Sequence, residues 1–420
     1  MPTQFTNLPI YQRERGFIGA LNFHIRKVDN KQDLMGFIRF PWRVYRDDPY
    51  WVPPLISERK AFLDPRQNPF FEHAEVELFL AQRACPELYP ERSEGPRRDG
   101  ETIGTVAAII NDNHNDFHQE RTGFFGLFEV IEDYAVAEAL LATARDWVQA
   151  RGMDVIRGPM NMSINDECGL LIDGFDSSPV VMMTYNPRYY VDFIERFGFV
   201  KAKDLYAYII STDIFNREVS KLPPKFLRVA EVAGKRAGVQ VRRVNMRDFD
   251  AEVEKAKAIY NSAWEKNWGA VPMTDAEFDH LAQGLKQFLD PDLLLVAETS
   301  EVSQTSEVYR PVGVFVGLPD VNQPLLHVNG RLFPLGWIKY LWYRRKIDTF
   351  RAVIMGVIEE YREKGIDALM YVEAAKVAFR KGYRWCEMSW ILEDNVMMNR
   401  ILQRLGGEIY KTYRIYEMVL

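Results

Sequence analysis

A polar stretch at residues 158–169 carries the densest set of side chains that could bind a substrate. It holds two amides, a hydroxyl and two carboxylates, contributed by Asn161, Ser163, Asn165, Asp166 and Glu167. Such groups donate and accept hydrogen bonds and can hold a positive charge, so they predict a binding site for a polar amine. The alternative is a structured loop in which these side chains cap their own turns, the more common role of Asn, Asp and Ser. The sequence leaves both interpretations open.

Two histidines, His114 and His118, stand four residues apart, with Glu120 just beyond them. On a helix this spacing would place both imidazoles on one face, where they could hold a metal ion. Residues 113–120 read instead as a loop between two strands. We therefore predict no metal site and assign both histidines to substrate contact.

The last part of the chain reads as strand, polar turn, helix, glycine corner and strand. Residues 386–392 are short and mixed-apolar, and Glu393-Asp394-Asn395 supplies capping residues for the helix that follows. Apolar side chains recur at helical spacing over residues 396–405, Gly406-Gly407 ends the helix, and residues 409–418 alternate like a strand. This block resembles the C-terminal part of the GNAT (acyl-CoA N-acyltransferase) fold, with Asn395 and Gly406 at the spacing of the family's Asn and Gly.

The order of elements repeats along the chain. Each half shows strand, helix, strand, polar tip, a strand with an early glycine, a further strand, a long helix and a glycine turn. Each half then ends in an Asn-led short helix and a glycine corner, and Tyr185-Asn186-Pro187 with residues 195–200 resembles the family ending more closely than the second half does. We predict an α/β (α+β) protein of two tandem GNAT-like domains, each a mixed, mostly antiparallel twisted sheet flanked by helices. The predicted bounds are 1–212, a linker at 213–224, and 225–420.

The resemblance implies a CoA site on the loop between the central strand and the long helix. There, free N–H groups and the positive end of the helix dipole bind a pyrophosphate. In the second half Arg362 and Gly365 fit the family pattern, although Asp367 replaces a small residue and adds a negative charge. An ordinary charged helix start is the alternative. We assign the co-substrate, acetyl-CoA or another acyl-CoA, to Val357, Ile358, Arg362, Lys364, Gly365 and Asn395.

The first half has carboxylates at the corresponding place, namely Glu129, Glu132 and Asp133. Because like charges repel, a pyrophosphate should not bind there. We therefore expect CoA to bind only the second half.

The family often uses a tyrosine of the short helix as general acid. The matching positions here are Leu402 and, in the first half, Ile194, and neither can donate a proton. Glu387 on the strand, with Tyr410 and Tyr413 nearby, are the substitutes that we predict to act as catalytic groups.

Composition bounds the function classes. A chain of 420 residues with 47% hydrophobic and 27% charged residues is long enough for two globular domains. A net charge of −6 gives no general basic face for nucleic acid or anionic lipid. The three well-separated cysteines, Cys85, Cys168 and Cys386, favour a reducing compartment and neither a disulfide framework nor a zinc site. We expect a cytoplasmic protein with no nucleic-acid or membrane partner and leave the oligomeric state open, a homodimer included.

The function implied by the resemblance is an N-acyltransferase that moves an acyl group, expected to be acetyl, from acyl-CoA to the amine of a small molecule. An aromatic-rich insertion at residues 322–346 could line an acyl channel, or could be interface or core. One alternative is a non-catalytic GNAT-fold ligand-binding or regulatory protein, which the missing tyrosine and Asp367 favour. Another is a Fem-like aminoacyl or peptidyl transferase, against which the acidic net charge weighs because such enzymes use tRNA.

Overall fold

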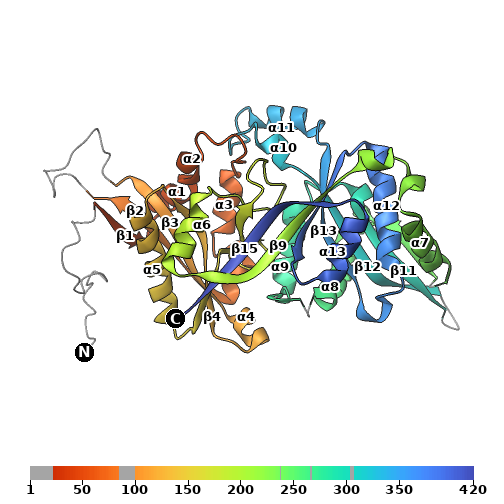
Figure 1. Cartoon of the computed structure of the whole chain (residues 1–420), viewed down its shortest axis with the longest axis horizontal. Coiled ribbons are helices and arrows are strands. Elements are labelled where there is room, and N and C mark those ends of the chain that lie inside the picture. The colour runs from red at the N-terminus through yellow and green to blue at the C-terminus, as the bar shows by residue number, and fades with distance from the viewer. Residues whose placement is uncertain (1–21, 85–99, 237, 265–266, 303–306) are drawn as a thin grey trace.

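Strands from both halves of the chain form one continuous sheet in this computed structural model (Figure 1). The structure describes residues 22–84, 100–236, 238–264, 267–302 and 307–420. Within these residues the main sheet has 13 strands in the order β1-β2-β3-β4-β5-β15-β9-β14-β13-β12-β11-β10, with β8 beside β15. The first half thus occupies one end of the sheet and the second half the other.

The elements of the first half, in chain order, are β1 (Phe23–Lys27), α1 (Lys31–Arg39), α2 (Pro41–Val44), α3 (Ile56–Phe62), β2 (Ala74–Arg83), β3 (Thr102–Asn111), α4 (Asp112–His118), β4 (Thr122–Val130), α5 (Tyr134–Gln149), β5 (Val155–Gly158), β6 (Met160–Asn161), β7 (Glu167–Cys168), β8 (Leu170–Asp173), α6 (Tyr189–Phe197) and β9 (Val200–Ser211). Those of the second half are α7 (Pro224–Arg236), β10 (Val239–Arg243), α8 (Phe249–Trp264), α9 (Asp275–Leu285), β11 (Leu294–Val302), β12 (Glu307–Pro319), α10 (Asn322–Leu325), α11 (Gly336–Arg344), β13 (Thr349–Val357), α12 (Ile366–Lys381), β14 (Trp385–Leu392), α13 (Val396–Arg404) and β15 (Glu408–Val419). Short 3₁₀ turns connect several of them, including Thr212–Phe215 and Val219–Lys221 within the predicted linker.

Helices cover both faces of the sheet, and the sequence explains which side of each helix is buried. In α5 the side chains of Val136, Leu140, Leu141 and Ala144 recur at helical spacing and lie in the core against β3 and β4. In the second half α12 packs against α7 and the sheet, and α8 and α9 pack together on a second apolar cluster. Thr274 followed by Glu277 three residues later has the form of a capping box in the sequence, and the two side chains form one at the start of α9.

The last strand of each half pairs with the sheet of the other half. Strand β15 is antiparallel to β5, with Tyr416 opposite Gly158, and β9 is antiparallel to β14, with Ile210 opposite Cys386. The two long strands also pair with each other across the centre of the molecule (Figure 1). The predicted domains are continuous stretches of the chain. In the structure, however, a strand from the other side of the linker completes each half of the sheet.

Each half contains one pair of parallel strands that separates after a few residues. Strands β4 and β5 pair over Thr122–Phe124 and Val155–Arg157, and β13 and β14 pair over Thr349–Ala352 and Trp385–Met388. Beyond these residues the two strands of each pair move apart and no longer form backbone hydrogen bonds with each other. These two separations lie toward the middle of the sheet and adjoin the cavities described below.

Three segments needed the structure to decide or correct them. The periodicity of residues 350–358 fits either a strand or the start of a helix, and the structure forms strand β13 at Thr349–Val357. The sequence of residues 180–184 is typical of a strand, but in the structure a turn at 181–182 interrupts it and no strand forms. Residues 112–118, expected as a loop, form helix α4, which Asn111 caps by accepting a hydrogen bond from the backbone N–H of His114. In the described part of the chain, no helix is both long and apolar enough to cross a membrane.

Candidate active site

Four adjoining cavities run from the surface of the first half into the second half. The outer groove, about 800 Å³, is lined by residues 43–44, 46–50, 175–176 and 185–188. It shares Tyr185 and Asn186 with the Glu129 cavity, which measures about 190 Å³. That cavity shares Met182 with the Asp166 cavity, which measures about 180 Å³. The fourth, an apolar cavity of about 90 Å³ under α8 and α9, shares Tyr260 and two other residues with the Asp166 cavity.

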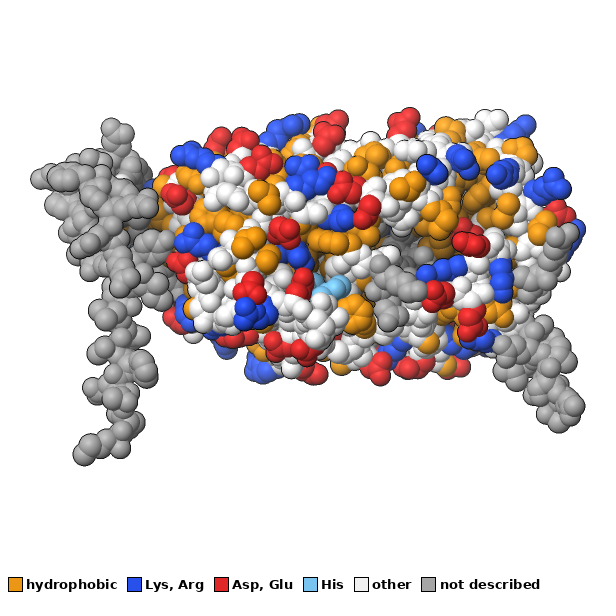
Figure 2. Space-filling view, turned by 60° about the horizontal axis from the view of Figure 1, so that its bottom comes forward, with side chains coloured by type: hydrophobic (Ala, Val, Ile, Leu, Met, Phe, Trp, Pro, Cys, Tyr) orange, Lys and Arg blue, Asp and Glu red, His pale blue; other side chains and the backbone are white. Residues whose placement is uncertain are grey.

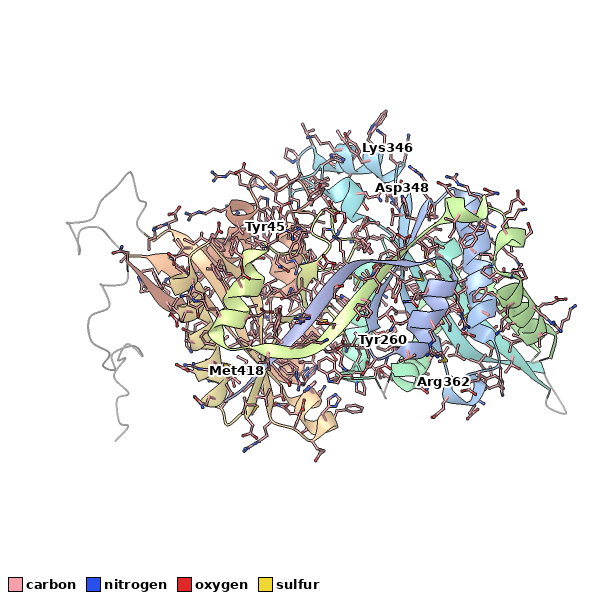
Figure 3. The ribbon with its side chains drawn as sticks, in the orientation of Figure 1. Tyr45, Tyr260, Lys346, Asp348, Arg362 and Met418 are labelled. Atoms are coloured by element: carbon pink, nitrogen blue, oxygen red, sulfur yellow. The ribbon has the colours of Figure 1, made fainter. Side chains whose placement is uncertain are left out.

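The cavities lie next to one another from the first half to the second, and residues of both halves line them. Tyr45, which contacts Glu129, and Tyr260 come from the first and second halves respectively and are labelled in Figure 3. Concave, partly apolar space with a few convergent polar groups is the usual form of a ligand site. The polar groups in these walls therefore define the candidate site.

Glu129 is a carboxyl group with a strongly raised pKa that faces a cavity. It lies near the end of β4, where Tyr190 Oη donates to its Oε2 at 2.8 Å and Tyr45 Oη donates to the same atom at 3.0 Å. Burial raises the pKa of Glu129 to about 8, although the hydrogen bonds from Tyr190 and Tyr45 and the charge of Arg59 act in the opposite direction. A carboxyl group with a pKa near neutrality can take up and release a proton under physiological conditions.

The predicted substrate loop forms the small hairpin β6–β7 and the turn between its strands, and it separates two of the cavities. Asn161 and Glu167 line the Glu129 cavity, where Asn161 Oδ1 accepts from the backbone N–H of Leu127 at 2.7 Å and Glu167 forms an ion pair with Arg59. Asn165 lines the Asp166 cavity and contacts the second half, because its Nδ2 donates to the carbonyl of Val271 at 3.1 Å. The loop therefore lies between the halves and has polar atoms on both sides.

Asp166 and Ser163 form the inner turn of this loop. Ser163 Oγ donates to Asp166 Oδ2 at 2.9 Å, and the backbone N–H of Ser163 donates to the same oxygen at 3.3 Å. Burial raises the pKa of Asp166 to about 7, against these two hydrogen bonds. Ser163 therefore caps the turn, as the second interpretation of the loop expects. Asp166 accepts these two hydrogen bonds and in addition lines the cavity. Cys168 lies in the same wall, but burial raises the pKa of its thiol far above neutrality, so it is not a thiolate nucleophile.

His114 and His118 lie on one face of α4, with ring centroids 4.6 Å apart, so the expectation that they sit in a loop was wrong. His114 Nε2 is 2.6 Å from Glu120 Oε1, and His118 Nε2 is 2.9 Å from the carbonyl oxygen of Ala270. Neither histidine lines the four cavities. The described residues contain no group of three or more His, Cys, Asp or Glu side chains that could hold a metal ion.

The predicted catalytic residues Glu387, Tyr410 and Tyr413 lie together in a buried cluster at the centre of the sheet. The Glu387 side chain is fully buried, its Oε2 is 3.4 Å from Arg351 Nε, and no described group donates a well-formed hydrogen bond to either carboxylate oxygen. Burial raises the pKa of Glu387 to about 7, against the charge of Arg351 and the nearby hydroxyls of Ser389 and Tyr410. Burial also raises the pKa of Tyr410 and of Tyr413 well above their usual value.

This cluster lies behind the wall of the Asp166 cavity. Arg351 and Ser389 line that cavity, whereas the three predicted catalytic residues do not. Arg351 is held in place by its own hydrogen bonds, because one nitrogen donates to the carbonyls of Val181 and Met182 at 2.8 and 3.0 Å. A substrate in the cavity would therefore meet Arg351 before Glu387.

Five of the six residues assigned to CoA lie at or just before the start of α12, Asn395 lies at the start of α13, and none of the six lines the four cavities. Arg362 Nε donates to the carbonyl of Val357 at 3.3 Å, directly before Ile358, and Lys364 Nζ lies 4.3 Å from the ring centroid of Tyr361. The remaining two, Gly365 and Asn395, have evident structural roles. Gly365 has φ +80° and precedes α12, where a Cβ atom would lie 2.6 Å from Val229 Cγ1. Asn395 caps α13 by accepting from the backbone N–H of Met398 at 3.1 Å.

Sequence reasoning missed the roles of Glu129, Tyr45 and Arg351 in this region. It treated Glu129 only as a charge that repels pyrophosphate, because position along the chain does not show that two tyrosines converge on that carboxylate. Tyr45 and Tyr190 are far apart in sequence, and Arg351 reaches the Asp166 cavity from the centre of a strand. A charged residue at an otherwise apolar strand position, as in residues 349–357, is the one signal that could have drawn attention to Arg351.

Two known proteins are similar to this chain over nearly its whole length. Protein YghO of Escherichia coli is 36% identical over 402 residues, which are 94% of this chain and 94% of that protein. A protein of Caulobacter vibrioides named bacterial ceramide synthase is 36% identical over 400 residues, which are 94% of this chain and 96% of that protein. This chain belongs to their family. A scan of protein-family models gave no match for this member.

Solved structures identify the fold of this family member. A tandem GNAT protein from the clavulanic acid biosynthesis pathway aligns over 94% of this chain and 98% of its own length, with a TM-score of 0.54 and 12% identity. A GCN5-related glucosamine N-acetyltransferase region of a fungal β-N-acetylglucosaminidase covers 96% of this chain and 38% of that chain, with a TM-score of 0.52 and 15% identity. At these identities the similarity concerns the fold alone, and it confirms the GNAT fold and the mixed, mostly antiparallel sheet predicted from the sequence.

Proposed function

We propose that this protein is an N-acyltransferase that moves an acyl group from acyl-CoA to the amine of a long-chain amino alcohol. The GNAT fold supports acyl transfer, and the relative named ceramide synthase supports the class of acceptor, because a ceramide is the amide of a fatty acid and such an amino alcohol. The observation that carries the proposal is the Glu129 cavity. It offers a titratable carboxyl group beside apolar walls at the junction of the two halves.

Acyl transfer to an amine requires a group that accepts the proton of the amine, and the walls of the cavities contain candidates for this role. The amine nitrogen attacks the thioester carbon, a C–N bond forms, the C–S bond breaks, the nitrogen loses a proton and the sulfur takes one up. An alkylammonium ion has no free electron pair, so a base must first remove a proton from it. With a pKa of about 8, Glu129 can alternate near neutral pH between its protonated form and its ionised form, which attracts the ammonium ion and accepts a proton from it.

For the base we propose Glu129, because its side chain faces a cavity that an amine can enter. Glu387, with Tyr410 and Tyr413, is the second proposal. Its pKa of about 7 also suits a base, but its side chain is fully buried and an amine could reach it only if Arg351 moved. Substituting each glutamate separately distinguishes the two.

For the donor we keep the proposal that the CoA pyrophosphate binds near the start of α12, where Arg362 and Lys364 precede the helix. The outer groove is a competing place. It carries Arg43, Arg46 and Arg188 near the start of α6 and adjoins the Glu129 cavity, although Asp47 and Asp48 partly offset these charges. In either case the apolar cavity under α8 and α9 can accept part of the acyl chain.

A non-catalytic ligand-binding protein is the second candidate function. Two observations favour it: Asp367 in the first turn of α12, which weakens an anion site, and Leu402 at the position of the family's tyrosine. Such a protein would bind acyl-CoA or the amino alcohol and form no amide.

The test is a thiol-release assay with the purified full-length chain. A panel of acyl-CoA thioesters is combined with a long-chain amino alcohol or with a short amine, free CoA is measured over time, and the amide is identified by mass spectrometry. We expect amide formation with the long-chain acceptor and a loss of about 100- to 10,000-fold in kcat for Glu129→Gln. Glu132→Gln is the matched control, since Glu132 is exposed three residues further on and should leave the rate unchanged.

The outcomes separate the candidates. A rate lost in Glu387→Gln and retained in Glu129→Gln transfers the role of base to Glu387. Binding of either substrate without any amide product favours the non-catalytic protein. Product with short amines and none with the long-chain acceptor refutes the proposed class of acceptor.

A further inference from the structure

The insertion between β12 and β13 presents an unusually apolar and aromatic surface to solvent. Seven large hydrophobic side chains are exposed along residues 326–342, namely Leu326, Phe333, Leu335, Trp337, Ile338, Leu341 and Trp342, and Phe333 alone is 81% exposed. In α11 the pairs Trp337–Ile338 and Leu341–Trp342 are one helical turn apart and so share one side of the helix. Clustered exposed apolar side chains of this kind mark a surface for binding another molecule or a membrane.

The charged residues within the insertion itself are of one sign, although Asp320 and Asp348 flank it in the chain. Residues 321–347 contain Arg331, Lys339, Arg344, Arg345 and Lys346, all exposed, and no Asp or Glu, although the whole chain has a net charge of −6. On the face drawn in Figure 2, by contrast, acidic and basic side chains are interspersed. The insertion is therefore a local basic and aromatic surface on an acidic protein.

The inner side of the insertion packs against the rest of the protein. Its exposed outer side is therefore a separate surface and not the part of the insertion that packs in the core. Tyr340 of α11 is buried in a cluster with Leu325, Val328 and Val52 of the first half. Trp42 Nε1 donates to Asn329 Oδ1 at 2.8 Å, and the backbone N–H of Ile56 donates to the carbonyl of Gly330 at 3.1 Å. In Figure 1 α10 and α11 lie at the outer edge of the molecule, and in Figure 3 Lys346 lies on this same outer side.

We propose that the surface of residues 326–346 docks on a lipid bilayer that contains anionic headgroups. Tryptophan and other large apolar side chains enter the boundary between headgroups and acyl chains, while lysine and arginine pair with lipid phosphates. Charge complementarity selects a membrane over a protein partner here, because the insertion carries five exposed cations among its apolar side chains and contains no carboxylate of its own. The expectation of no membrane partner rested on the net charge of the whole chain, which this local arrangement does not share.

The docked orientation would place a cavity close to the lipid. Asn322 and Leu325 of α10 line the Glu129 cavity, and Asn322 Nδ2 donates to the carbonyl of Pro179 at 2.9 Å. A substrate that resides in the bilayer would then have a short route to the cavity. The docking proposal stands without this consequence and does not depend on acyl transfer.

Vesicle flotation of the purified full-length chain tests the proposal. The vesicles are phosphatidylcholine alone or phosphatidylcholine with one third phosphatidylglycerol. The first variant is Trp337→Ala/Trp342→Ala, and its control is Val200→Ala/Val419→Ala, which removes two exposed apolar side chains elsewhere. The second is Arg344→Glu/Lys346→Glu, and its control is Lys235→Glu/Lys376→Glu, which changes the net charge equally on α7 and α12. Circular dichroism melting checks that each variant is folded.

We expect the wild type to float with the anionic vesicles, to bind neutral vesicles less, and to dissociate as salt is raised. Both insertion variants should bind about tenfold or more weakly, and both controls should bind like the wild type. The proposal is overturned if the wild type does not float with anionic vesicles, or if the insertion variants bind as well as their controls. It is also overturned if sedimentation shows a wild-type dimer that the tryptophan variant loses while vesicle binding stays unchanged, because the surface would then join two copies of the chain.

Discussion

Glu129→Gln should change how the stability of the protein depends on pH. The carboxyl group has a pKa of about 8 when folded and an ordinary value of 4.5. Between these values the folded protein holds a proton that the unfolded chain has released, so wild-type stability falls as pH rises from about 4.5 to about 8. Glutamine has nearly the same shape as the protonated acid and cannot ionise, so this contribution disappears in the variant.

The size of the effect follows from the difference between the two pKa values. Each pKa unit corresponds to about 1.4 kcal/mol, so the full shift would amount to about 5 kcal/mol. Glu129 faces a cavity that water can enter, which reduces the cost of its charge, so we expect about 1 to 3 kcal/mol. Relative to the wild type, the variant should become more stable by this amount between pH 5 and pH 9.

Urea unfolding followed by circular dichroism at several pH values measures this difference directly. Asp166 and Glu387 have raised pKa values too, but they are present in both proteins, so their contributions cancel when the two curves are subtracted. Glu132→Gln is the control and should give no pH-dependent difference, because that side chain is exposed. A difference for Glu129→Gln that is flat between pH 5 and pH 9 would refute the raised pKa and with it the physical argument for Glu129 as the base.

Three further predictions test other parts of the site. Arg351→Met leaves the Glu387 carboxylate buried without its paired cation, so the free energy of unfolding should fall by about 3 to 5 kcal/mol in urea at pH 8 and by less at pH 5, where Glu387 is protonated. Ala282→Phe fills the apolar cavity and should lower kcat/KM more for long than for short acyl-CoA; an unchanged chain-length profile would place the acyl chain elsewhere. Lys364→Glu should weaken acyl-CoA binding about tenfold in calorimetry and Asp367→Ala should strengthen it. If neither changes the titration, the α12 loop does not bind the pyrophosphate.

The sequence predicted the fold further than it predicted the site, for a physical reason. Helices and strands follow local periodicity and capping, so α5, α9 and β15 could be placed from their own residues. A site depends on contacts between distant segments, and no local pattern shows that Tyr45 and Tyr190 hold Glu129. The segment around His114 was misread because its helix is short and polar and depends on the Asn111 cap.

The same distinction applies to the predicted catalytic groups. Glu387 comes from β14 and Tyr410 and Tyr413 from β15, two strands that flank β9, and the structure brings the three side chains together. Whether a side chain reaches a cavity depends on which other side chains lie between it and the cavity. Here Arg351 and Ser389 form part of the wall of the Asp166 cavity. Alternation along a strand separates its two faces but does not show how much protein covers each face.

The exchange of the last strands has a consequence for synthesis of the protein in the cell. Strand β5 needs β15 as its neighbour, and the contact between Arg157 and Glu417 spans 260 positions of the chain. While a ribosome is still making the second half, the first half exposes an unpaired strand edge that can associate with other nascent chains. A chain that stops before residue 408 would leave that edge exposed permanently, so premature termination should yield aggregated or degraded product instead of a functional first half.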